Sequence, residues 1–131
     1  MVMKSDTLQF DEIIFFEKVL ERNPAYLQAL RSLAEAYTAK GLFQKGLEMD
    51  KRLAKLRPED PLIHYNLACS FALTGQKENA LNSLRIAIRL GYRDFTYLKK
   101  DRDLKILHEE PAFNDLFPLN WKAKSRRRRS S

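Results

Sequence analysis

Cys69, His64 and His108 have the side chains of this chain that most often act as nucleophile, general base or metal ligand. A cysteine nucleophile needs a base within hydrogen-bond reach of its sulfur. His64 and Cys69 are five positions apart on one predicted helix, so they point to different faces, and nothing in the sequence brings His108 to Cys69. Structural zinc sites use clustered cysteine and histidine ligands, and these three residues are scattered. We therefore predict no catalytic residue and no metal, and interpret Cys69 as a small apolar packing residue.

The composition is that of a soluble globular protein, with 44% hydrophobic and 31% charged residues. The four glycines are isolated at predicted helix ends and form no phosphate-binding loop, so we expect no cofactor and no enzyme activity. No apolar run has the length of a membrane span, and the first residues lack the basic start and apolar stretch of a signal peptide. A single cysteine allows no internal disulfide. Together these features predict a cytoplasmic protein.

The net charge of +7 is concentrated near the C-terminus. Removing six cations there leaves 18 basic against 17 acidic residues. Residues 120–131 are therefore predicted to form a disordered basic tail, and any contact with RNA or an anionic membrane is expected only through it. The alternative is a solvated tail that aids solubility. The six cations are Lys122, Lys124, Arg126, Arg127, Arg128 and Arg129.

The elements that must position these residues are helices, because apolar residues recur at helical spacing and no segment alternates as a strand does. Asn23-Pro24 and Asp60-Pro61 are expected to cap and start helices, and Gly41, Gly75 and Gly91 to end them. Helices are predicted at 8–22, 24–40, 43–56, 61–74 and 77–90, followed by short helical turns over 93–119. The expected start signals of those turns are Asp94, Asp103 and Pro111.

Two stretches match when one is shifted 34 residues along the other. Leu33-Ala34 falls on Leu67-Ala68, Tyr37 on Phe71 and Gly41 on Gly75. The period and this spacing of small, aromatic and glycine residues resemble the tetratricopeptide repeat family. The second copy continues the pattern with Ala80 and Leu84, from which Gly46 and Asp50 depart in the first.

The resemblance implies an all-α, right-handed solenoid of helical hairpins over residues 8–119, flanked by tails at 1–7 and 120–131. It would contain half a repeat, two full repeats and a degenerate helical cap at the C-terminal end. Alanines would let the helices approach closely. The cap would cover the last apolar face with Tyr97, Leu98, Leu104, Leu107, Phe113, Leu116 and Phe117.

In the family, the first helices of successive repeats line a concave surface that holds a peptide or helix of a partner protein. The resemblance thus implies a non-catalytic adaptor. Some relatives clamp a C-terminal carboxylate, but Glu35 stands where a clamp asparagine would be and would repel that guest. The residues expected on this surface are Gln28, Arg31, Glu35 and Thr38 from one helix, and Leu62, Tyr65, Cys69 and Ala72 from the next.

The first predicted helix is apolar around an unusually wide arc, and it has no hairpin partner before it. Either the chain buries the surplus itself or another molecule does. One alternative function is therefore a self-associating subunit, a homodimer in which Phe10, Ile14 or Phe15 meets a second copy. The other alternative is an accessory factor that contacts RNA or an anionic membrane through its basic tail.

Overall fold

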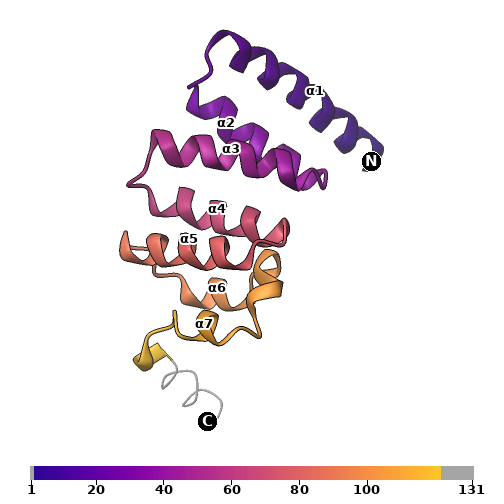
Figure 1. Cartoon of the computed structure of the whole chain (residues 1–131). Coiled ribbons are helices and arrows are strands. Elements are labelled where there is room, and N and C mark those ends of the chain that lie inside the picture. The colour runs from indigo at the N-terminus through magenta and orange to yellow at the C-terminus, as the bar shows by residue number, and fades with distance from the viewer. Residues whose placement is uncertain (1, 122–131) are drawn as a thin grey trace.

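The computed structural model describes residues 2–121, with side chains described from Phe10 onward. Consecutive helices pack against each other and are stacked in chain order from α1 to α7 (Figure 1). The predicted all-α array of helical hairpins is confirmed, with α1 followed by the hairpins α2–α3 and α4–α5 and then by short helices. The elements are α1 (Val2–Arg22), α2 (Leu27–Ala39), α3 (Phe43–Leu56), α4 (Pro61–Leu73), α5 (Lys77–Arg89), α6 (Phe95–Lys100), the 3₁₀ helix η1 (Arg102–Leu107) and α7 (Pro111–Asn114).

Three helices of the structure follow the 34-residue period. Helices α2, α4 and α6 begin at Leu27, Pro61 and Phe95, each 34 residues after the one before. The sequence match revealed only two of these starts, because α6 ends after six residues. It ends where Asp101 takes an extended conformation and its carboxylate accepts a hydrogen bond of 3.0 Å from the backbone N–H of Asp103. The cap of η1 is therefore Asp101, and the prediction that Asp103 starts this turn is wrong.

Two predicted helix starts are also corrected. α1 begins at Val2 instead of Leu8, because residues 2–7 contain no Gly or Pro to stop a helix. α2 begins at Leu27, because Pro24 lies in a turn closed by a hydrogen bond of 3.1 Å from Tyr26 N–H to the Asn23 carbonyl.

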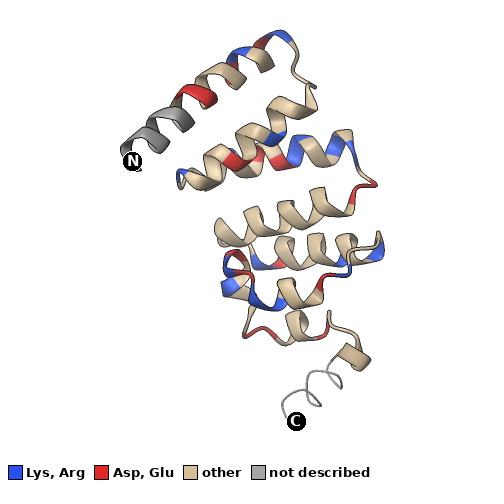
Figure 2. Ribbon diagram, turned by 180° about the vertical axis from the view of Figure 1, so that it is seen from behind, with Lys and Arg blue, Asp and Glu red and all other residues tan. Residues whose placement is uncertain are grey.

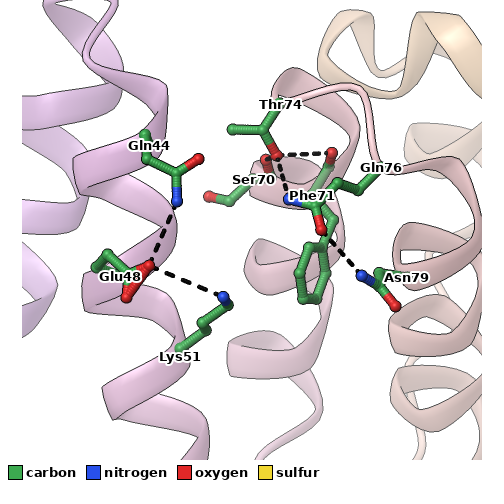
Figure 3. A network of polar contacts seen from close by, with 8 residues as sticks. All are labelled: Gln44, Glu48, Lys51, Ser70, Phe71, Thr74, Gln76 and Asn79. Carbon is green, nitrogen blue, oxygen red and sulfur yellow. Dashed lines mark hydrogen bonds and ion pairs between the residues drawn. The ribbon is translucent and has the colours of Figure 1, made fainter.

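The α4–α5 hairpin starts and turns as predicted. Asp60 caps α4, accepting hydrogen bonds from the backbone N–H groups of Leu62 and Ile63. Gly75 has the predicted positive φ of 81°, which ends the helix. Side chains then close the turn (Figure 3): Thr74 Oγ1 donates to two backbone carbonyls of α4 at 3.0 Å, and Gln76 Nε2 donates to Thr74 Oγ1 at 3.1 Å.

The buried side chains form two clusters. One joins α1, α2 and α3, and the other joins α4, α5 and the C-terminal segment. Ala68 and Ala80 are fully buried where α4 meets α5, so these small residues do permit close approach. Among the expected cap residues, Tyr97 is 48% exposed and does not cover the core, whereas five others are buried. These five are Leu98, Leu104, Leu107, Phe113 and Phe117.

No helix in the described part of the chain is long and apolar enough to cross a membrane.

Candidate functional site

A groove with a volume of about 560 Å³ lies against α2, α3, α4 and the segment 92–103. That volume is within the range of ligand pockets and suits a few side chains of a partner. Gln28 and Ala72 do not line it, and Ala72 is buried. The other six residues predicted for the partner-binding surface do line it: Arg31, Glu35, Thr38, Leu62, Tyr65 and Cys69.

The α2 wall of the groove is open to solvent. Glu35 is exposed, and in the described structure its carboxylate makes no hydrogen bond or ion pair. Arg31 is also exposed, but its guanidinium lies 3.7 Å from Asp60, the residue that caps α4. Of the two charged residues predicted on this stripe, Arg31 therefore has a charged partner, whereas Glu35 has none among the described residues.

The α4 wall is largely covered, contrary to the interpretation that its stripe faces outward. Tyr65 is only 5% exposed, and its ring stacks on that of Tyr92 with centroids 4.4 Å apart. Its hydroxyl donates a 2.6 Å hydrogen bond to Asp101 Oδ2, and the Cys69 thiol donates to the same oxygen at 3.7 Å. The segment after α6 thus folds onto α4, and Leu62, which is 60% exposed, remains open on this wall.

Cys69 lies in the core cluster of α4 and α5, as its interpretation as a packing residue requires. Burial, followed by the charge of Asp101, raises the pKa of its thiol. His64 does not serve it as a base, because His64 Nε2 lies 2.7 Å from the carbonyl oxygen of Pro58. The polar partner of Cys69 is Asp101. The two residues are 32 positions apart, and nothing in the sequence indicated this contact.

Cys69, Asp101 and Asp103 form a cluster that the sequence analysis missed, with one potential ligand atom of each within 4.8 Å of the others. Both oxygens of Asp101 already accept hydrogen bonds, Oδ2 from Tyr65 and Cys69 and Oδ1 from Asp103 N–H. Three donors are also fewer than the four of a structural zinc site. We therefore describe this cluster as the polar contact that fixes the C-terminal segment on α4.

Asp50 is a second functional candidate that the sequence analysis did not select. It belongs to α3, lines the groove and is only 5% exposed. Burial raises its pKa to about 6, although the Ser70 hydroxyl donates a hydrogen bond to its Oδ2 and opposes that shift. Its one signal in the sequence was its departure from the repeat pattern, since it stands where the second copy has Leu84.

The electrostatic field at the C-terminal end of the groove is negative. The charge of Asp101 is the largest cause that raises the pKa of Tyr97, whose side chain is half exposed. Burial and then the same charge raise the pKa of Asp103. In contrast, α4 supplies no charge at all, since Pro61–Leu73 contains no Lys, Arg, Asp or Glu and is uncoloured in Figure 2. The acidic groups thus come from the elements on either side of α4.

The predicted self-association residues lie on α1. Phe10 and Phe15 are 59% and 60% exposed, and Ile14 is 40% exposed. Ile13 and Leu20 on the same helix are buried in the core cluster of α1, α2 and α3. The chain therefore covers one edge of the wide apolar arc and leaves the other edge open. The basic tail residues from Lys122 to Arg129 lie outside the described residues.

No protein-family model matches this sequence. The chain is similar to a chloroplastic protein from Arabidopsis thaliana, with 26% identity over 108 residues that cover 79% of this chain. The aligned part is 32% of that protein, so the chain spans about a third of the length of this relative.

Proposed function

We propose that this protein is a non-catalytic adaptor of the tetratricopeptide repeat family, which holds a peptide or helix of a partner protein in the groove. The observation that carries the proposal is the position of the groove. It lies against α2, α4 and α6, which begin at 34-residue intervals and occupy the first-helix position of successive repeats. Side chains at equivalent positions of consecutive repeats then form a continuous surface that can contact an extended segment or a helix.

The chemistry of the groove supports a protein partner. Leu53, Leu62 and Leu73 supply apolar contact, and polar groups of α2, α3, α4 and the segment 92–103 border them. Apolar surface beside a few fixed polar groups is the composition that gives a binding site both affinity and orientation. The buried thiol of Cys69 and the separate contacts of His64 support a binding role over nucleophilic catalysis.

Selection from a displayed library of random 12-residue peptides tests this function with the full chain. Asn66→Trp fills the groove, since Asn66 is exposed and lines it. Asn82→Trp is the matched control, because Asn82 is an exposed asparagine on α5 outside the groove. We expect peptides that bind the wild type and Asn82→Trp but not Asn66→Trp. The absence of any selected peptide, or equal binding to all three proteins, would contradict the proposal.

The exposed edge of α1 favours self-association as a second candidate function. Phe10, Ile14 and Phe15 form an apolar surface on a helix whose described contacts are mainly with α2. A two-fold interface would place this surface on both copies. Sedimentation at micromolar concentration should then show a dimer that Phe15→Glu converts to a monomer. A monomeric wild type at high concentration would eliminate this candidate.

We further propose a cytoplasmic location, which the single unpaired cysteine supports. The name of the relative places that protein in the chloroplast, so the test must separate these compartments. Fluorescent tagging of the protein at its C-terminus, in cells of its source, should give a diffuse cytoplasmic signal, and a signal confined to an organelle would contradict the proposal.

A further inference from the structure

The acidic groups of the groove have almost no positive charge to balance them. Four carboxylates line it, those of Glu35, Asp50, Asp101 and Asp103, against the single guanidinium of Arg31. Arg31 lies toward Asp60 instead. The excess of acidic residues in the groove is opposite in sign to the net charge of the whole chain, which is +7.

Asp50 is the group for which the imbalance matters most. The described structure gives its carboxylate one hydrogen bond, from Ser70 to Oδ2, and none to Oδ1. Asp50 is only 5% exposed and lines the groove, so a group bound there would lie beside its carboxylate. A carboxylate that is removed from water without a counter-charge lowers the stability of the fold. Such a group in a cleft indicates a functional site.

We propose that the groove selects a partner segment carrying a lysine or arginine side chain, whose charged end enters beside Asp50. This inference rests on the protein-binding function proposed above. The aliphatic stem of that side chain would lie along Leu53, Leu62 and Leu73, as long basic side chains do on apolar surfaces. Glu35 and Asp103, which make no side-chain hydrogen bond or ion pair in the described structure, would surround the entering cation.

The charges also exclude the opposite guest. An acidic segment or a free C-terminal carboxylate would meet Glu35 and the negative field around Asp101. Charge complementarity of this kind contributes most to the choice between partners, because juxtaposed like charges disfavour the wrong one. A basic segment of another polypeptide is therefore the occupant that the groove fits.

The test uses the full chain and the random 12-residue peptide library, in a buffer with EDTA to remove metal ions. We expect the selected peptides to be enriched in Lys and Arg. In one such peptide, replacing Arg by citrulline removes the charge while keeping the shape, and calorimetry should show about tenfold weaker binding. Groove-dependent peptides without Lys or Arg would overturn this inference and leave the adaptor function standing, whereas failure to select any peptide would remove both.

Two variants locate the effect. Asp50→Asn should bind the Arg peptide about tenfold more weakly than the wild type and should not distinguish it from the citrulline peptide. Glu59→Gln, which changes an exposed carboxylate outside the groove, should leave both affinities unchanged. A merely structural role of Asp50 would not couple the residue to the charge of the peptide. Equal discrimination between the two peptides by wild type and Asp50→Asn would overturn the proposal.

The chain's own basic tail is the other occupant that the same chemistry could admit. A variant of the full chain distinguishes the tail from a partner segment as the occupant. In this variant serine replaces four residues, Arg126, Arg127, Arg128 and Arg129. We expect this variant to select the same basic peptides with the same affinity as the wild type. Selection of basic peptides only after these replacements would assign the groove to the tail and overturn a partner protein as its occupant.

Discussion

The α2–α3 and α4–α5 hairpins place their helices at positions 34 residues apart, and three of the differences between their interiors replace a polar residue or a glycine of the first hairpin by an apolar residue of the second. Thr38 and Gly46 of the first hairpin correspond to Ala72 and Ala80 of the second. Asp50 corresponds to Leu84, which is fully buried. The second hairpin buries Ser70 and Ser83 but no carboxylate of its own, whereas the first buries the carboxylate of Asp50 and has an open charged wall.

The difference concerns residues of the first hairpin that interrupt its apolar interior. The second hairpin has apolar, buried residues at all three positions. A buried carboxylate is instead retained at the position that faces the groove. Thr38 and Asp50 line the groove and Gly46 does not, so two of the three departures from the repeat pattern coincide with the candidate site.

The largest effect is expected from placing the acid of the first hairpin into the second. Leu84→Asp would bury a carboxylate at a position that is fully buried in the core cluster of α4 and α5. No hydroxyl would be available to it there, because the residue that corresponds to Ser70 is the buried Leu104. We expect a loss of at least about 4 kcal/mol in the free energy of unfolding. Thermal and urea denaturation followed by circular dichroism would measure it. A loss below about 1 kcal/mol would mean that both interiors tolerate charge equally.

Removing the charge of Asp50 should stabilise the first hairpin in a pH-dependent way. The pKa of Asp50 is raised from 3.8 to about 6 in the folded protein, so the folded state binds this proton more tightly than the unfolded state. Its contribution to stability is therefore most favourable below about pH 4, falls as pH rises to about 6, and is constant above. Asp50→Asn should remove this dependence and stabilise the protein at pH 7 by up to about 3 kcal/mol.

Urea denaturation of wild type and Asp50→Asn at pH 4, 5, 6 and 7 would measure the difference. The control is Glu59→Gln, an exposed site for which the difference from wild type should not change with pH. If Asp50→Asn is less stable than wild type at pH 7, the hydrogen bond from Ser70 outweighs the cost of burial, and Asp50 is a structural residue.

The smallest effect concerns how closely α2 and α3 approach. A Cβ at Gly46 would lie 2.8 Å from Thr38 Oγ1, so Gly46→Ala alone should destabilise the protein by about 1 kcal/mol despite the better helix propensity of alanine. Adding Thr38→Ala reproduces the pair of the second hairpin. The double variant should be about 1 kcal/mol more stable than wild type. Additive effects in this double-mutant cycle would show that the two positions are independent.

Local signals predicted much of the fold. The 34-residue period, the cap at Asp60 and the positive φ of Gly75 depend on residues close in sequence, and each is present. Asp94 was predicted as a start signal and does cap α6, but the place of this helix in the 34-residue period was not recognised, because the helix is cut short by the contacts of Asp101.

The candidate site was predicted only in outline. The helical spacing placed Arg31 and Glu35 on the groove wall, but burial of Tyr65 depends on Tyr92 and Asp101, which fold back from 27 and 36 positions away. No periodicity encodes such a contact. The role of Asp50 was hidden for a different reason, since a departure from a repeat pattern signals either a weak repeat or a functional residue, and only its burial beside the groove separates the two.

The central claim is that the groove between the two hairpins receives a partner segment. The most direct test is to follow the backbone amide signals of the ¹⁵N-labelled full chain by NMR while an Arg-containing peptide from the library is added. We expect shifts concentrated in α2, α4 and residues 101–103, with α1 and the outer face of α5 unchanged. Shifts centred on α1, or spread over the surface without a maximum at the groove, would contradict the claim.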